Sequence, residues 1–207
     1  MLELMQKGGP LMWPLLACSI LALAAFLERI VYLHRATIEV GDLLSGLANL
    51  IRYGSFDEAQ RECAATPGPV ARVLHAAIAR HQAPRSELRD IVQEAGQLEV
   101  PRLERNLTLL SALAHLAPLL GLLGTLLGMT QVFLSMSAHG GYATASDISA
   151  GIYQALLSAS TGLAVAIPTQ AAYFFLSSRV NKLLHDIERA GIEIVRLLRD
   201  VPSQPAP

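Results

Sequence analysis

Three long apolar stretches alternate with polar segments along the chain, and this alternation is the main structural signal in the sequence. The apolar stretches cover residues 11–33, 106–136 and 148–178. Each exceeds the roughly 20 residues with which an α-helix crosses the hydrocarbon core of a bilayer. Charged residues concentrate instead at 34–105 and 179–200. The pattern predicts an all-α membrane protein with three transmembrane helices and long cytoplasmic helical extensions.

The segments outside the spans and the charged regions are short. Residues 1–10 are predicted to be a tail on the outer side of the membrane, and residues 137–147 an outer loop with a turn at 139–141. Asp147 is a suitable N-cap for the third membrane helix. The last residues, 201–207, contain three prolines and are expected to be disordered.

The first span has a second interpretation, a cleaved signal peptide, because Ala22 and Ala24 form an A-x-A pattern. Against cleavage, the single Lys7 of the N-terminal tail is balanced by Glu3, and the apolar run continues beyond the pattern. Two further spans also follow. The sequence therefore favours an uncleaved first helix.

The polar region 34–105 is predicted to fold into short amphipathic helices separated by turn signals. Ser55 and Glu58 have the spacing of a capping box, in which each side chain would bond the other residue's backbone. The Pro-Gly-Pro sequence at 67–69 forces a break. Helices are expected at 39–53, 55–65 and 70–81 and from Ser86 toward the second span, the last one interrupted or bent near Pro101.

The third span and the charged segment after it are predicted to form one helix. The segment 179–200 is amphipathic, and only Pro168 and Gly191 could interrupt the helix. A single helix over 148–199 would be about 75 Å long at 1.5 Å per residue. Such a helix would extend well beyond the membrane.

The positions of Lys and Arg orient the three spans. Arg29, Arg35 and Arg105 lie beside the inner ends of the first two spans, and five basic residues follow the third. The loop at 137–147 has no Lys or Arg. By the positive-inside rule, the N-terminus lies outside, while the region 34–105 and the C-terminus lie in the cytoplasm.

Overall composition excludes several classes of function. The formal net charge is -1, which does not indicate a nucleic-acid partner. The two cysteines, Cys18 and Cys63, have neither a CxxC motif nor a histidine at ligand spacing, so no metal site or disulfide framework is predicted. The chain contains no HExxH, GxSxG or phosphate-binding loop. We therefore expect neither enzymatic activity nor a cofactor.

A stripe of small residues runs along the second span. Ala117, Gly121, Gly124 and Gly128 recur at helical spacing, which lets a neighbouring helix approach closely. Thr125 lies beside this stripe, while Pro118 near its start removes one backbone donor. The pattern predicts a packed, pore-lining helix; the alternative is a helix that only packs in a bundle.

The spans offer hydroxyl and amide groups but almost no carboxylate, Glu28 near the end of the first being the exception. Intramembrane carboxylates are the usual proton carriers of pumps and transporters, so a proton-moving protein of this kind would need one from another chain. Gln154, Ser158 and Thr161 lie on one helix face at i, i+4 and i+7, with Thr125 expected opposite them. They would form a polar lining, or they would bond to their own helix carbonyls and to neighbouring helices.

His115 is the one histidine within a span. Its ordinary pKa near 6.5 would let it titrate or relay a proton. The alternative is a neutral histidine that bonds a neighbouring helix or water.

Several separated motifs together resemble the ExbB/TolQ/MotA family of bacterial proton-channel subunits. They are APLLGLLGTLLGM in the second span, GIYQALLSASTGLAVAIPTQAAY in the third, the N-terminal GGPLMWPLLACSILALAAFLERIVYL and the polar PGPVARVL. Three spans place the chain nearer ExbB and TolQ than the four-span MotA.

The resemblance implies a homopentamer in the bacterial inner membrane that encloses single-span partners of the ExbD/TolR type. The partner helix would supply the Asp that these spans lack. Proton flow past the pentamer's hydroxyls would energise a TonB-like or TolA-like protein that acts on the outer membrane. The partners implied are therefore other copies of the chain, these proteins, the lipid bilayer and protons.

The resemblance also assigns roles to single residues. Thr125 matches the pore threonine of the family's GLLGT motif, Pro118 and Pro168 match family prolines, and Gly162 joins Gly121, Gly124 and Gly128 as close-packing glycines.

Two positions depart from the family pattern. Ala159 stands where a second threonine is usual, so Ser158, Ser160 and Thr161 are the candidates to replace it. Gln154 stands where ExbB-type chains often have Glu. Two other classes of function, a small-solute permease subunit and a structural membrane scaffold, are the alternatives.

Overall fold

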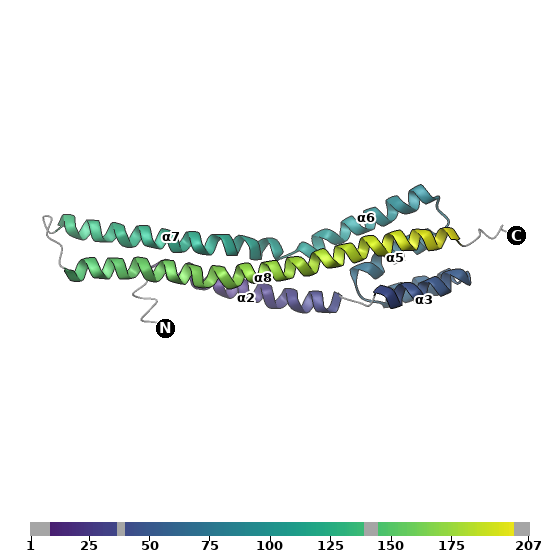
Figure 1. Ribbon diagram of the computed structural model, residues 1–207, viewed down its shortest axis with the longest axis horizontal. Coiled ribbons are helices and arrows are strands. Elements are labelled where there is room, and N and C mark those ends of the chain that lie inside the picture. The colour runs from purple at the N-terminus through teal and green to yellow at the C-terminus, as the bar shows by residue number, and fades with distance from the viewer. Residues whose placement is uncertain (1–8, 37–39, 139–144, 201–207) are drawn as a thin grey trace. The chain divides into compact units, whose positions relative to one another are not determined.

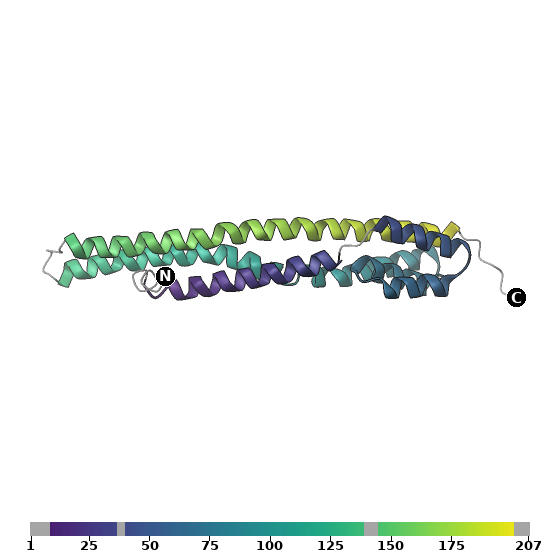
Figure 2. The ribbon, with the colours of Figure 1, turned by 90° about the horizontal axis from the view of Figure 1, so that it is seen from below.

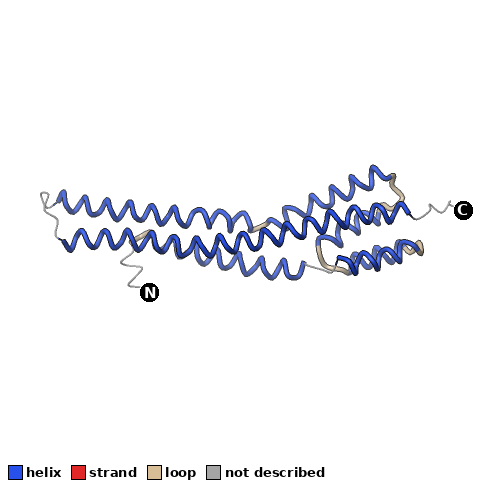
Figure 3. Tube along the Cα trace, viewed as in Figure 1, coloured by secondary structure: helices blue, strands red, loops and turns tan. Residues whose placement is uncertain are grey.

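The computed structural model describes residues 9–36, 40–138 and 145–200, with no side-chain description for residues 145–147 and 200. Within these ranges every regular element is an α-helix, which confirms the predicted all-α class (Figure 3). Three helical stretches are long and apolar enough to cross a membrane. The helices are α2 Met12–Ala36, α3 Val40–Arg52, α4 Phe56–Ala65, α5 Pro69–Ala79, α6 Arg85–Glu104, α7 Leu107–Ala138 and α8 Ala145–Asp200 (Figure 1).

The chain divides into two compact units. The apolar unit comprises residues 1–29 and 106–176, and the polar unit comprises residues 30–105 and 177–207. Helix α8 belongs to both, because it runs through Pro168 and Gly191 without a break. One continuous helix through both residues is what the sequence predicts for this segment.

The apolar unit is built from α2, α7 and α8, with α7 and α8 lying side by side in two perpendicular views (Figures 1 and 2). Leu15, Ala117 and Ala166, one from each helix, form its buried cluster. Large apolar side chains also cover the outside, among them Trp13 at 62% exposure and Ile167 at 67%. An apolar exterior of this extent suits a hydrocarbon solvent, because in water such a surface would aggregate.

The polar unit has the core of an ordinary water-soluble domain. Fully buried apolar side chains come from α3, α5, α6 and the second half of α8, and they exclude water from the middle of the unit. The largest of them are Leu47, Ile51, Leu74, Ile78, Leu103 and Ile194.

Charged groups inside the polar unit centre on Glu99 of α6. Its side chain is only 5% exposed and accepts hydrogen bonds from Arg72 Nε at 2.9 Å and from Arg102 at 2.8 Å. The side-chain hydrogen bond to Glu99 raises the pKa of Arg72, and Tyr32 of α2 adds to the effect. The network joins three helices, and because 27 residues separate Arg72 from Glu99, sequence periodicity gave no sign of it.

Arg72→Ala is expected to destabilise the polar unit by about 2 kcal/mol, because a buried carboxylate loses two charge-assisted hydrogen bonds. Arg61→Ala on α4 is the matched control, since Arg61 is exposed and surface substitutions stay within about 0.5 kcal/mol. Denaturant unfolding followed by circular dichroism measures both. Equal midpoints for the two variants would contradict the structural role of the pair.

Cys63 of α4 is 2% exposed, and burial, together with the neighbouring Glu62, raises the pKa of its thiol from 9.0 to about 11. Because the folded-state pKa lies above the unfolded value, this contribution to stability is complete below pH 9 and lost as the pH rises through 11. Unfolding measured across that window should therefore show a steeper loss of stability for the native chain than for Cys63→Ala. Identical pH profiles would contradict the burial of the thiol.

The break between α6 and α7 lies later than the sequence predicts. Helix α6 runs through Pro101, where the proline removes only one intrahelical hydrogen bond, and ends at Glu104, so the interruption predicted near Pro101 lies a few residues further on. The chain turns instead at Asn106, whose φ of 62° lies in the left-handed region that asparagine tolerates. The Asn106 amide donates a hydrogen bond to Glu28 of α2, within the apolar unit.

Three smaller predictions at helix ends are wrong. Ser55 is the N-cap of α4, but it makes no side-chain cap bond, so the capping box does not form. Helix α5 ends at Ala79, and His81 lies in the following turn, where its ring stacks on Phe56 at 4.0 Å. Asp147 is not an N-cap, because α8 already begins at Ala145. The turn at 139–141 and the tail at 201–207 fall outside the described residues.

Candidate functional site

Helices α7 and α8 approach closely because small residues face each other along their contact. A Cβ atom on Gly162 would lie 2.8 Å from the Cα of Gly121 and 2.9 Å from the carbonyl oxygen of Ala117. A Cβ on Gly128 would lie 2.8 Å from the carbonyl oxygen of Gly151. Real Cβ contacts are not this short, so these glycines permit backbone-to-backbone packing. The sequence predicts Gly121, Gly128 and Gly162 as packing residues of the membrane helices.

The contact on α8 is also a stripe of small residues, of which the sequence predicts only Gly162 as a packing residue. Gly151, Ala155, Ser158 and Gly162 follow each other at helical spacing and face the glycines of α7. Gly151 packs directly against Val132, and Ser158 directly against Gly124. The spacing of four small residues in the printed sequence is the signal that could have found this surface.

The register of this contact decides which side of the helix pair each candidate residue occupies. Gly124 of α7 and Ser158 of α8 face each other directly across the contact. Successive helix residues turn by about 100°, and in an antiparallel pair the residues that follow two opposed contacts lie on the same side. Thr125 follows Gly124 and Ala159 follows Ser158, so both lie on one side, which we call the Thr125 face. Pro118, which follows the buried Ala117, lies on this face as well.

The other side of the pair carries Gln154 and Thr161, which precede the contact residues Ala155 and Gly162. Gly9 covers part of it, because it packs against the Gln154 amide. Helix α2 continues this cover, since Leu120 and Val165, which also precede contact residues, pack against its Leu15 cluster. The Thr125 face is therefore the side away from α2.

Both threonine hydroxyls donate to their own helix. Thr125 Oγ1 donates to the Leu122 carbonyl and Thr161 Oγ1 to the Leu157 carbonyl, each at 2.7 Å. The backbone-bonding interpretation of these side chains is thus observed. A hydroxyl that donates in this way still has lone pairs with which it can accept a hydrogen bond. At the Thr125 face the hydroxyl is therefore an acceptor.

The two serines beside Ala159 are differently placed. Ser158 is fully buried between the helices, and Ser160, two residues further round the helix, is exposed on the side away from α7. With Thr161 on the α2 side, none of the three lies on the Thr125 face where Ala159 stands. Of these four residues, Thr125 is thus the one whose hydroxyl lies on the Thr125 face, at the height of Ala159.

His115 is exposed, and its Nδ1–H donates to the Ser111 carbonyl at 2.7 Å, which leaves Nε2 open. Pro118 is half-buried and Pro168 exposed. Each proline lacks the N–H that would bond the carbonyl four residues earlier, at Ala114 and Ala164. Among the described residues, no group of acidic, histidine or cysteine side chains could hold a metal ion.

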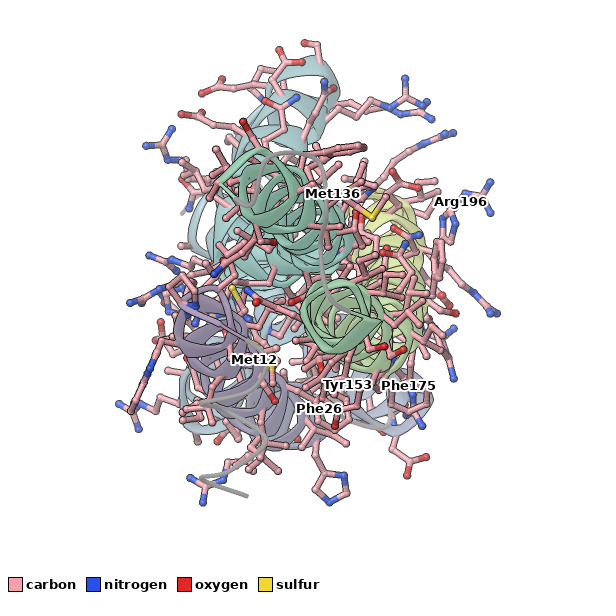
Figure 4. The ribbon with its side chains drawn as sticks, turned by 90° about the vertical axis from the view of Figure 1, so that its left-hand side faces the viewer. Met12, Phe26, Met136, Tyr153, Phe175 and Arg196 are labelled. Carbon is pink, nitrogen blue, oxygen red and sulfur yellow. The ribbon has the colours of Figure 1, made fainter. Side chains whose placement is uncertain are left out.

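The apolar unit also holds a cavity of about 550 Å³ between α2 and α8. Phe26 and Phe175 line it (labelled in Figure 4, which views the chain end-on), together with Ser19, Pro168 and Thr169. Thr169 donates to its own helix at Val165, and no ionisable side chain is among the lining residues. The cavity can therefore accommodate an apolar group, but it has no side chain that could transfer a proton.

A sequence model of the MotA/TolQ/ExbB proton channel family matches residues 65–189, more than half of the chain. The chain belongs to this family. The matched range contains both small-residue stripes and Thr125. Family membership and the three apolar helices together make the chain a membrane protein of ExbB/TolQ type.

Individual family members align over most of the chain. The Synechocystis protein named ExbB-like 3 is 34% identical over 96% of this chain and 97% of its own length. The Vibrio cholerae biopolymer transport protein exbB1 is 29% identical over 90% of this chain and 83% of its own length. An ExbB homologue of Methanothermobacter thermautotrophicus is 28% identical over 90% of this chain, which spans 66% of that relative's length.

Proposed function

We propose that the chain is the channel-forming subunit of a proton-driven motor in the bacterial inner membrane. Several copies, five by the resemblance to ExbB and TolQ, enclose single-span partners of the ExbD/TolR type. The motor energises a TonB- or TolA-like protein in transport or envelope maintenance. The observation that carries the proposal is the Thr125 face: a helix-pair surface with one accepting hydroxyl and half-buried Ala159 beside it, on the side that α2 leaves uncovered.

The orientation in the membrane follows the positive-inside rule. The N-terminus lies in the periplasm, and the polar unit and the C-terminus lie in the cytoplasm. In this arrangement the Thr125 faces of the copies surround the partner helices, while α2 faces lipid with its exposed apolar side chains. The proton path then combines Thr125 with an acid from the partner.

The hydrogen bond that Thr125 makes determines whether its face binds the protonated or the ionised form of the partner's acid more favourably. Because the Thr125 hydroxyl donates its proton to the Leu122 carbonyl, only its lone pairs are available to the acidic side chain of the partner helix. A protonated carboxyl can donate to these lone pairs, whereas a carboxylate has no proton to give and meets a poor donor. The ionised form is also costly against an apolar wall. The face therefore favours the neutral acid, and loss of the proton drives the partner away from it.

Reconstitution into liposomes tests the proposal. Proton flux under an imposed pH gradient is expected from the chain together with a single-span partner that carries a membrane Asp, and not from either protein alone. A partner in which this Asp is replaced by Asn is the control and should give no flux. Proton flux through the chain alone would contradict the claim that the partner supplies the proton-carrying Asp.

One observation favours a second candidate, a membrane scaffold without proton conduction. Thr125, Thr130, Thr161 and Thr169 all donate to their own helix, which is what hydroxyls that only stabilise a bundle would do. The same experiment separates the two functions. A stable complex with the partner that passes no protons would support the scaffold.

A further inference from the structure

The polar unit contains a groove between α6 and the second half of α8, with a volume of about 660 Å³. Its two ends differ chemically. Arg85, Arg89 and Arg196 line one end, and Val100 and Leu184 line the other. Glu188 is the one carboxylate among the lining residues. The groove is thus basic at one end and apolar at the other.

Two glycines fix the register of the groove. Gly191 packs directly against Val92, and a Cβ on Gly96 would lie 3.5 Å from Ile187. The helices therefore run antiparallel, and Arg196 is level with the stretch between Arg85 and Arg89. Residues 85 to 100 extend over about 22 Å of helix at 1.5 Å per residue. A groove of this length accommodates several turns of a helix rather than a small molecule.

Helix α6 has three distinct faces, as its 100° periodicity shows. One face, with Leu88, Glu99 and Leu103, is buried in the unit. A second lines the groove. The third is an acidic stripe that is exposed throughout and ends in an apolar residue, Leu98 at 65% exposure. The acidic stripe consists of Glu87, Asp90, Glu94 and Leu98.

The groove and the acidic stripe match each other at their two ends, in charge at one and in apolar character at the other, while Glu94 of the stripe and Glu188 of the groove lie at the same level between the ends. Glu87 and Asp90 lie at the same level as the three arginines, and Leu98 lies at the level of Val100 and Leu184. Copies whose α8 helices cross one membrane are related by rotation about the membrane normal, which leaves every residue at its own height. The stripe of one copy would therefore meet the groove of the next with acid against base and Leu98 against the apolar end.

We infer that the occupant of the groove is the acidic stripe of a second copy of this chain. The contact joins two different surfaces, so it is heterologous, and it forms a ring when the rotation between neighbouring copies closes on itself. The inference rests on the oligomer in the proposed function and assigns the surface by which neighbouring copies join. Opposite charges held near an exposed apolar contact give specificity of neighbour and register.

Disulfide cross-linking tests this arrangement without measuring proton flux. Leu98→Cys and Val100→Cys are combined in one chain; two residues apart on a helix, they point about 200° away from each other and cannot bond within a copy. Oxidation in native membranes is expected to give a ladder of covalent multimers. Each single variant and the parent chain, with its Cys18 and Cys63, should stay monomeric.

Charge reversal in the same cysteine background supplies the second arm. Arg85→Glu with Arg89→Glu should lower the multimer yield about tenfold, and so should Glu87→Arg with Asp90→Arg. All four reversals together should restore it, which a simple folding defect would not do. Arg61→Glu, an exposed reversal on α4, is the matched control and should change nothing.

Three results would overturn the inference. Cross-linking of a single variant as efficient as that of the pair would indicate a two-fold contact. If the double variant stays monomeric and keeps its native helical content, a second copy does not occupy the groove, and an acidic segment of another protein becomes its occupant. Failure of the four reversals to restore the yield would remove the charge match. Multimers that cross-link yet conduct no protons with the partner would contradict the proposed function alone.

Discussion

Replacing Gly162 by alanine is expected to destabilise the apolar unit by about 3 kcal/mol, because the added Cβ overlaps backbone atoms of α7. Its nearest neighbours would be the Gly121 Cα at 2.8 Å and the Ala117 carbonyl oxygen at 2.9 Å, and neither can move without separating the helices. Thermal denaturation of the purified protein in detergent, followed by circular dichroism, measures the loss.

Gly41→Ala is the matched control for this prediction. Gly41 lies in α3, and a Cβ there would meet nothing within 4 Å. Because alanine is favoured over glycine in a helix, and less strongly in the first turn, where Gly41 lies, than in the interior, this variant should gain up to about 0.5 kcal/mol. The same chemical change is thus expected to have opposite signs at the two positions. A neutral or stabilising Gly162→Ala would show that α7 and α8 do not pack at backbone distance.

Thr125→Val is expected to lower partner-dependent proton flux about 100-fold, the scale on which removal of a proton-transfer group acts. Valine keeps the shape of threonine but has no oxygen to accept a hydrogen bond from a protonated acid. Thr125→Ser keeps the oxygen and should retain most of the flux. Liposomes that contain the chain and its partner, with an internal pH indicator, measure all variants under one imposed gradient.

Thr161→Val controls for the helix rather than the face. Both threonines are half-buried and donate to their own helix at 2.7 Å, so the two valine variants should lose similar stability. Only Thr125 lies on the side away from α2, and only its replacement should reduce flux. Equal losses from the two variants would mean that packing, and not the Thr125 face, explains the effect.

Periodicity along one helix predicted the elements of this site but not their partners. Ala117, Gly121, Gly124 and Gly128 form a packing stripe in the sequence, and the structure brings α8 against it. The set Gln154, Ser158 and Thr161 forms one helix face in sequence as well. In the structure Ser158 is buried against α7, while Gln154 and Thr161 lie on the side that α2 covers. The helix face that the three residues share is wider than the strip of α8 that contacts α7.

Tertiary contacts explain what else the sequence could not supply. The pairing of Arg72 with Glu99 depends on how α5 packs against α6, and no local pattern encodes it. The packing of Gly9 on Gln154 joins segments more than 140 residues apart. The failure of the capping box at Ser55 has a local cause instead, since its ψ of 61° departs from the extended backbone typical of an N-cap.

Thiol accessibility at two positions tests the central claim, that the Thr125 face receives the partner helix. Thr125→Cys and Thr161→Cys are compared in membranes with a charged, water-soluble thiol reagent, and the parent chain gives the background from Cys18 and Cys63. We predict that Thr125→Cys is labelled in the chain alone and protected when the partner is co-expressed, while Thr161→Cys is labelled in neither case. Labelling of Thr161→Cys with partner-dependent protection, and none of Thr125→Cys, would contradict the account.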